Sequence, residues 1–214
     1  MKLTLREWQS SLKPKEEILY NCSEFIHQSD QWVSFPIGMG FTFINYQGPL
    51  EKVQLGEHNI LILCSINPTN DNNRRPIGIN RSNILKTLSL QGISNTYMDS
   101  NLYFETLPNY KFVISPEGNG IDCHRHYEAL MAGCIPIVEE NEMIKEKYKG
   151  CPILYTKDYS EITHEYLEKK YKEMLVKEYD FSVLFLNCYD NETIKQIKEN
   201  GSYWSSRLTG KKWY

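Results

Sequence analysis

From about residue 59 onward, short apolar runs alternate with longer amphipathic segments. The apolar runs have the length of strands and are Asn59–Ser65, Lys111–Ser115, Ile135–Val138 and Pro152–Tyr155. The amphipathic segments have helical spacing and are Ser82–Leu90, Asp122–Met131, Glu142–Lys149 and Tyr159–Val176. Strands that alternate with helices predict an α/β fold with a doubly wound, parallel, Rossmann-like sheet. The first run is apolar throughout, which predicts a strand covered on both faces.

The two ends of the chain carry weaker patterns. Lys15–His27 places apolar residues on one helical face and predicts an amphipathic helix. The segment Gly48–Glu57 is the best candidate boundary, and it divides the chain into a small N-terminal segment, 1–57, and a larger domain, 58–214. The final part, Asp180–Tyr214, is expected to be helical with an aromatic tail.

The composition is that of a globular protein. The 214 residues are 41% hydrophobic and 24% charged, with a formal net charge of −3, which excludes a disordered or collagen-like chain and predicts no bulk attraction to nucleic acid. The apolar runs are far shorter than the ~20 residues of a membrane helix, and the charged N-terminus is unlike a signal peptide. We therefore expect a cytoplasmic protein. The six cysteines form no Cys-x-x-Cys pair, which predicts reduced thiols without zinc.

The segment Phe112–Val138 carries the most informative pattern. A strand leads into a loop with two glycines, Gly118 and Gly120, and a helix follows. Glycines allow backbone conformations that are closed to other residues and let a ligand approach the main chain. Asp122 is placed to cap the helix, whose free N–H groups and dipole favour an anion. Such loops are common in α/β proteins, so the pattern alone is weak support for a phosphate site.

Arg125 and Glu128 lie three positions apart and share one face of that helix. An arginine beside a helix N-terminus suits a diphosphate, because its planar fork binds two phosphate oxygens. A glutamate one turn later could accept hydrogen bonds from two ribose hydroxyls. The competing interpretation is a solvated ion pair between the two side chains.

The whole string resembles the donor-binding signature of exostosin-like glycosyltransferases, glycosyltransferase family 47 and its relatives. It reads Ser-Pro-x-Gly-x-Gly from Ser115, then Arg-x-x-Glu-Ala-Leu from Arg125, then Gly-Cys-Ile-Pro-Ile-Val. The resemblance covers about Ile60–Tyr155 and implies the donor half of a glycosyltransferase B fold. It also implies that Arg125 holds the donor diphosphate and Glu128 the ribose. It places Gly118, Asn119 and Gly120 around the sugar phosphate, and we expect Ser115 and Glu117 to contribute to donor binding as well.

Two departures from the family pattern affect the expected mechanism. Retaining members of the wider fold often carry a second glutamate eight residues before the ribose glutamate, and this chain has Gly120 there. This favours an inverting, single displacement. The chain also has only about 57 residues ahead of its first strong strand, so the acceptor half is truncated, minimal or supplied by another chain.

Three arginines follow the first strong strand, namely Arg74, Arg75 and Arg81. They could neutralise donor phosphates from across the cleft, or they could be ordinary loop charges. No Asp-x-Asp pair occurs in the chain, and we expect a metal-independent site in which arginine and a helix dipole replace a divalent cation.

The general base is not identified by the sequence. His124 and His126 flank Arg125 but point to different faces, so at most one of them faces a ligand. Asp122 and Glu117 are alternative acid or base groups. His27 and Asp30 form the only close acid–base pair in the N-terminal part.

Aromatic residues raise one further possibility. Trp32, Phe35 and Tyr46 could form a platform for a sugar ring, although core packing is the commoner use of such residues. The segment Tyr203–Arg207 could fold back on the larger domain.

We therefore expect an inverting glycosyltransferase that takes a sugar from a UDP- or GDP-sugar and transfers it to a carbohydrate or glycoprotein acceptor. The expected catalytic residues are Arg125, Asp122 and His124. The alternatives are a non-catalytic nucleotide-binding module that acts with a partner chain, and a purely structural α/β domain.

Overall fold

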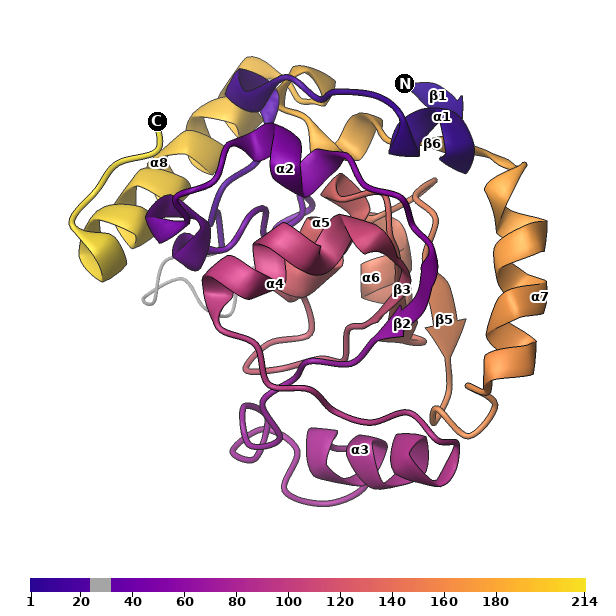
Figure 1. Cartoon of the computed structure of the whole chain (residues 1–214). Coiled ribbons are helices and arrows are strands. Elements are labelled where there is room, and N and C mark those ends of the chain that lie inside the picture. The colour runs from indigo at the N-terminus through magenta and orange to yellow at the C-terminus, as the bar shows by residue number, and fades with distance from the viewer. Residues whose placement is uncertain (24–31) are drawn as a thin grey trace.

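A parallel sheet forms the centre of the molecule. The computed structural model describes residues 1–23 and 32–214. The sheet contains β2 (Ile60–Leu63), β3 (Tyr110–Ile114), β4 (Ile135–Glu139) and β5 (Leu154–Thr156), in that spatial order (Figure 1). The predicted α/β class and parallel sheet are confirmed, and the arrangement is consistent with a Rossmann-like fold. The strand order runs in one direction, so this sheet has no reversal point of the kind that places ligands in doubly wound folds.

Eight α-helices accompany the sheet in the described residues. They are α1 (Leu5–Gln9), α2 (Leu50–Gln54), α3 (Arg81–Leu90), α4 (Ser100–Thr106), α5 (His124–Met131), α6 (Glu142–Lys147), α7 (His164–Leu175) and α8 (Asn191–Thr209). Side-chain oxygens of Asn80, Thr163 and Asp190 accept backbone N–H groups at the starts of α3, α7 and α8. These caps satisfy N–H groups that have no partner inside the helix, which is why the helices begin there.

Short 3₁₀ helices and an antiparallel ribbon complete the fold. The 3₁₀ helices are η1 (Lys15–Glu17), η3 (Phe41–Asn45), η4 (Leu107–Asn109), η5 (Ser182–Leu184) and η6 (Leu186–Cys188). The ribbon pairs β1 (Lys2–Thr4) with β6 (Glu178–Asp180).

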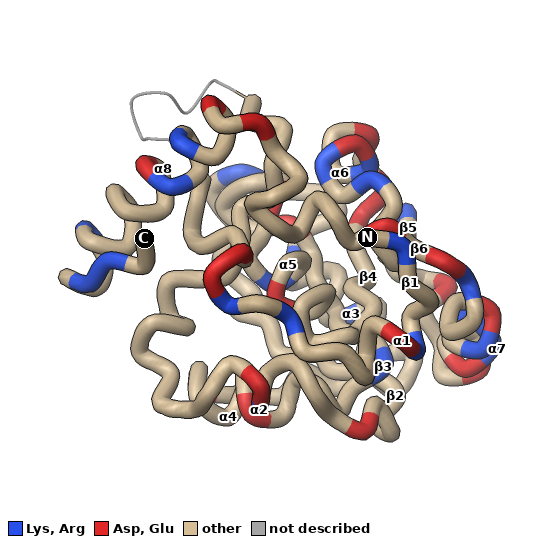
Figure 2. Tube along the Cα trace, turned by 90° about the horizontal axis from the view of Figure 1, so that it is seen from above, with Lys and Arg blue, Asp and Glu red and all other residues tan. Residues whose placement is uncertain are grey.

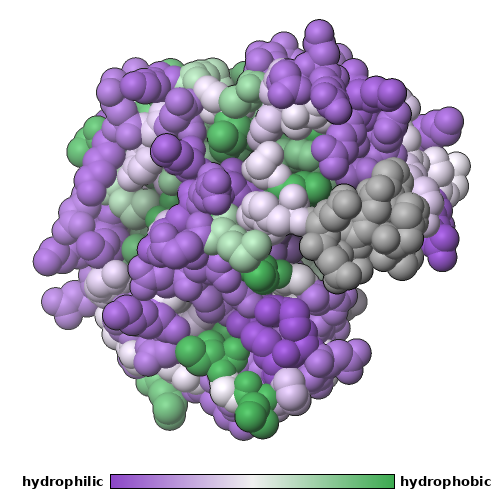
Figure 3. Space-filling model, turned by 180° about the vertical axis from the view of Figure 1, so that it is seen from behind, coloured by the Kyte–Doolittle hydropathy of each residue, from purple (hydrophilic) through white to green (hydrophobic). Residues whose placement is uncertain are grey.

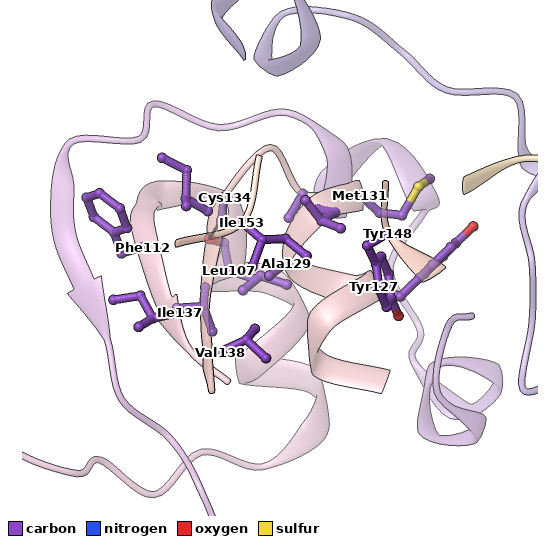
Figure 4. Packing of buried hydrophobic residues seen from close by; sticks show 14 of the residues in the cluster. Leu107, Phe112, Tyr127, Ala129, Met131, Cys134, Ile137, Val138, Tyr148 and Ile153 are labelled. Carbon is purple, nitrogen blue, oxygen red and sulfur yellow. Dashed lines mark hydrogen bonds between the residues drawn. The ribbon is translucent and has the colours of Figure 1, made fainter. Parts of the chain in front are cut away.

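Burial separates the inner strands from the edge. All five residues of β4 are buried, as are Phe112, Val113 and Ile114 of β3, and Figure 4 shows these strands contributing to the core together with Tyr127 and Ala129 of α5. The prediction that the first strand is covered on both faces holds only toward its carboxyl end, since Leu63 is buried but Ile60 is 46% exposed, and β2 lies at an edge of the sheet. An apolar run alone does not distinguish an edge strand from a central one.

The N-terminal helix predicted over Lys15–His27 is also wrong within the described residues. Only η1 is helical, and after it Ile18 and Tyr20 form isolated β-bridges with Phe185 and Met39. The hydrogen bonds of this stretch go to a distant segment, because the backbone N–H of Met39 donates to the carbonyl of Leu19 and that of Asn21 donates to the carbonyl of Met39. Residues 24–27 of the predicted helix lie outside the described part.

The C-terminal tail packs against residues 18–20 of the N-terminal segment, far from the N-terminus itself, which lies beside β6 (Figure 1). The Tyr214 hydroxyl donates to the carbonyl of Ile18, and Trp213 stacks on Tyr20 with ring centroids 4.3 Å apart. At Gly201 of α8 an added Cβ would lie 2.4 Å from the carbonyl oxygen of Tyr20, so only glycine allows this approach. One hydrophobic core spans both sides of the sequence boundary at 57/58, and the two-part division stays a sequence prediction.

The surface is mixed in charge and polarity. Acidic and basic residues are interspersed along α6 and α7 (Figure 2), and in the view from behind the apolar side chains form small separate groups (Figure 3). None of the helices in residues 1–23 and 32–214 combines the length and apolar character that crossing a bilayer requires.

Candidate functional site

A large cavity lies at the N-terminal end of α5. It has a volume of about 960 Å³, and its walls come from the loop after β3, from the N-terminal segment, from α6 and from α8. A second cavity of about 440 Å³ lies beyond the end of β2, next to α4. Arg125 and Glu128 line both cavities. The two residues at the centre of the sequence motif therefore stand where the cavities meet.

Arg125 has an unusual environment for a cation. Its Nε is buried without a hydrogen-bond partner, and no carboxylate oxygen of the described residues lies within 4.0 Å of its guanidinium. The ring of Tyr103 lies beside the guanidinium, with its centroid 5.4 Å from Cζ. A cation held in this way is poorly compensated, so an anionic ligand would be favoured beside it.

Arg81 is a second such cation at the same cavity. It is 3% exposed, and its Nε and Nη2 donate to the backbone carbonyls of Glu117 and Pro116, at 2.8 and 3.1 Å. No carboxylate in the described part of the chain forms an ion pair with it. Burial lowers the pKa of the Arg81 guanidinium, and the neighbouring positive charge of Arg125 acts in the same direction. Both arginines therefore leave positive charge at the cavity.

The start of α5 adds backbone donors. Among the hydrogen bonds of the described residues, none uses the backbone N–H of His124 or Arg125. These are first-turn groups, which have no carbonyl partner inside the helix. Free N–H groups and the positive end of the helix dipole favour an anion at this position.

Glu128 is buried, with 5% exposure, and its Oε1 accepts the backbone N–H of Gly40 at 3.2 Å. The alternative of an ion pair between Arg125 and Glu128 is not observed in the described residues. Gly40 fits only because it lacks a side chain, since an added Cβ would lie 2.6 Å from Glu128 Oε1. The carboxylate is thus held by the N-terminal segment, and it still borders both cavities.

The glycines of the loop act differently from the prediction. Neither Gly118 nor Gly120 has a positive φ. An added Cβ at Gly118 would lie 2.9 Å from Arg81 Nη2, whereas at Gly120 it would make only ordinary contact. Gly118 therefore allows the guanidinium to approach the loop. Both glycines and Asn119 line the larger cavity, as expected for a ligand loop.

Arg74 and Arg75 are engaged in ion pairs and line neither of these cavities, contrary to a role on donor phosphates. Arg74 Nη2 lies 2.6 Å from Glu117 Oε2. Arg75 lies between Asp71, 2.9 Å away, and Glu139, 2.8 Å away. Their charges are neutralised by carboxylates that the sequence does not show to be neighbours.

Ser115 and Glu117 were expected at the donor, but both are buried and line neither cavity. Ser115 is 0% exposed, and its Oγ is 2.6 Å from Nδ1 of the equally buried His126. Burial lowers the pKa of His126, which favours the neutral imidazole. Glu117 pairs with Arg74. Both residues position the loop from behind.

Asp122 is not the N-cap of α5. The helix begins at His124, so the N-cap position is occupied by Cys123. The Asp122 carboxylate instead accepts hydrogen bonds from the backbone N–H of Ile37, at 2.9 Å, and from the Tyr148 hydroxyl, at 2.8 Å. Lys147 Nζ lies 3.1 Å away. Asp122 thus links the loop before α5 to the N-terminal segment and to the end of α6. A carboxylate engaged in this way is poorly suited to act as a base.

His124 is the better placed of the two histidines. Its Nδ1 is 2.9 Å from the carbonyl oxygen of Gly38. A carbonyl only accepts, so Nδ1 carries the proton and Nε2 of the neutral ring holds a lone pair. Nε2 has no partner among the described residues and is not one of their buried unpaired atoms. His124 lines the larger cavity, whereas His126 does not.

Several residues of the larger cavity, among them Lys147, Asn21 and Phe41, are not predicted as site residues. Lys147, 3% exposed, pairs with Asp122 and lies 4.1 Å from the ring of Trp32. Asn21 and Phe41 come from the N-terminal segment. No local signal identifies them, because Asn21 and Phe41 reach the site only through the path of the N-terminal segment over α5, and Lys147 reaches it from α6.

The aromatic predictions divide. Trp32 lines the larger cavity, but Phe35 is 1% exposed in the core and Tyr46 packs against Phe43 and Phe104. Trp204, from the expected C-terminal fold-back, also lines the cavity. His27 and Asp30 lie outside the described residues.

Comparison with known proteins gives no assignment. Across the part of the chain that the structure describes, no group of three or more His, Cys, Asp or Glu side chains could hold a metal ion. No protein-family model matches the sequence, and no curated protein matches it. The function has to be inferred from the chemistry of the cavity itself.

Proposed function

We propose that the protein is a glycosyltransferase that uses a nucleotide sugar. One observation carries the proposal: the guanidiniums of Arg81 and Arg125 form no ion pair with a carboxylate of the described residues, and both border the same cavity at the start of α5. A diphosphate is the common ligand with two adjacent negative groups that suits paired arginines and a helix N-terminus. In this proposal residues 58–214 act as the donor half of a glycosyltransferase B fold.

The donor is assigned by position. Arg81, Arg125 and the first backbone N–H groups of α5 bind the diphosphate, and Glu128 binds the ribose hydroxyls from the point where the cavities meet. Gly118, Asn119 and Gly120 border the sugar. Because negative charge grows on the diphosphate as it leaves, the two guanidiniums contribute more to the transition state than to ground-state binding.

The reaction is a single displacement with inversion at the anomeric carbon. The acceptor hydroxyl oxygen forms a bond to that carbon, the bond from the carbon to the phosphate oxygen breaks, and the nucleoside diphosphate leaves with the electron pair. Nε2 of His124 takes the proton of the hydroxyl, since its partner nitrogen is already held as a donor to Gly38.

A thermal-shift screen against UDP, GDP, CMP and their sugars tests the nucleotide. At a hundredfold excess over Kd, one bound ligand stabilises the folded state by about 2.7 kcal/mol, which raises the Tm of a chain this size by about 5–10 °C. Arg125→Gln should abolish the shift. Arg207→Gln, an exposed arginine of α8 that lines neither cavity, is the matched control.

The stabilising nucleotide sugar is then incubated with the protein, and release of nucleoside diphosphate is measured. Release that depends on His124 and Arg125 supports a transferase. No shift with any nucleotide overturns the proposal. A shift without transfer or hydrolysis would instead identify a nucleotide-binding module.

A further inference from the structure

The N-terminal wall of the larger cavity has a chemistry of its own. The N-terminal wall consists of Asn21, Trp32 and Phe41, which line the cavity. Trp32 is 39% and Phe41 is 37% exposed, in contrast to core aromatic residues such as Trp8 and Tyr127, which are fully buried. Two aromatic rings at the edge of a cavity offer flat apolar surfaces to a ligand.

Asn21 adds an unpaired amide to these rings. The residue is 2% exposed, and its Nδ2 has no hydrogen-bond partner among residues 1–23 and 32–214. Its backbone is in the left-handed region, with φ of 46°, which asparagine tolerates better than most residues. A buried amide without a partner is unfavourable, so a ligand oxygen that accepts from it would be favoured.

The wall also lies beside the reacting groups. The backbone N–H of Asn21 donates to the carbonyl of Met39. The residues on either side of Met39 contact the proposed site residues, because the carbonyl of Gly38 bonds to His124 and the backbone N–H of Gly40 donates to Glu128. Ligand groups on the wall are therefore on the same side of the cavity as the proposed base.

Trp32 is held in place before any ligand binds. Lys147 Nζ lies 4.1 Å from the centroid of its ring, and the same ammonium group is fixed by Asp122 at 3.1 Å. A ring fixed in this way loses little freedom when a ligand stacks on it.

We propose that the N-terminal wall binds the acceptor and that the acceptor is a carbohydrate. A sugar ring has an apolar face of C–H groups for Trp32 and Phe41, and hydroxyl oxygens at its edge for the Asn21 amide. An aliphatic acceptor would fit the rings but would leave the amide unpaired. The inference rests on the proposed function, because it takes the other side of the cavity as the donor site. It also completes the acceptor side within this chain.

The test measures binding of simple sugars to the protein with nucleotide bound. Methyl glycosides of glucose, galactose, mannose and N-acetylglucosamine serve as probes, and saturation-transfer NMR and tryptophan fluorescence report binding. At least one glycoside should bind. Trp32→Ala and Asn21→Gly should each weaken its binding about tenfold, the effect of one lost contact, while the nucleotide Kd changes less than twofold. Glycine at position 21 keeps the left-handed backbone and removes only the amide.

Tyr166→Ala is the matched control, since it removes a partly buried ring of α7 that lines neither cavity. The inference is overturned if no glycoside binds while the nucleotide does, or if glycoside binding is equal in all variants. Either result leaves the nucleotide proposal standing. Absence of nucleotide binding, by contrast, overturns the proposed function itself.

Discussion

Arg75→Gln tests whether the loop arginines serve the fold or a ligand. The Arg75 side chain is 14% exposed and touches three carboxylates, those of Asp71 at 2.9 Å, Glu139 at 2.8 Å and Glu117 at 3.5 Å. Burial lowers its pKa, but the hydrogen bond and charge of Glu139, with the charges of Glu117 and Asp71, more than offset this and raise the pKa overall. The cation is thus stabilised by the folded protein itself.

Glutamine removes the charge and leaves three buried or nearly buried carboxylates close together. Removing one partner of a buried pair costs about 3–5 kcal/mol. This is a large part of the roughly 5–15 kcal/mol that stabilises a typical protein, and it corresponds to a fall in Tm of about 6–20 °C. Arg74→Gln should cost only about 1 kcal/mol, because Arg74 is 31% exposed and pairs with one carboxylate.

Urea unfolding followed by circular dichroism gives both stabilities, and nucleotide Kd is measured at a low temperature where each variant is folded. We expect Arg75→Gln to lose stability and to keep its nucleotide affinity. A stability loss below about 1 kcal/mol, or a loss of affinity at unchanged stability, would refute the reasoning and return Arg75 to the ligand.

Three further predictions concern other parts of the chain. Ser115→Ala leaves the buried Nδ1 of His126 without its partner, so urea unfolding should show a loss of about 1–3 kcal/mol; a weakened nucleotide Kd at unchanged stability would contradict this. Gly40→Ala places a Cβ against Glu128 and should weaken nucleotide binding about tenfold in calorimetry, or about 1.4 kcal/mol; an unchanged Kd would remove Glu128 from the site. Burial lowers the pKa of Lys13 to about 7. Between pH 7 and 10 Lys13 is therefore protonated in the unfolded chain but largely neutral in the folded one. The free energy of unfolding then rises with pH, by up to about 1.4 kcal/mol per pH unit. Lys13→Met should remove that rise, and parallel stability–pH curves for the two proteins would show the prediction to be wrong.

The central part of the fold could be predicted because its signals are local. The apolar run before the loop and the amphipathic segment after it form β3 and α5 within one or two residues of the expected bounds. The helix predicted over Lys15–His27 failed because apolar residues at helical spacing also suit a segment buried on several sides. Its backbone bonds depend on Met39, and no local pattern shows that contact.

The candidate site could be predicted only in part for a similar reason. Arg125 and Glu128 are three residues apart, so a shared helical face brings them to one place. The partners of Arg75 are different in kind, because Glu139 is 64 positions away. Whether a charge is neutralised or available is decided by such distant partners, and the sequence shows only the charge.

The ion pairs around Arg75 link the chain segments at the carboxyl ends of three parallel strands, β2, β3 and β4. Asp71 and Arg75 follow β2, Glu117 follows β3, and Glu139 ends β4. Their relative positions are therefore set during folding, when the entropy of ordering them is lost. A ligand that binds to the folded protein does not have to order these segments. Its association rate should therefore be limited by diffusion and orientation, and not by closure of a loop.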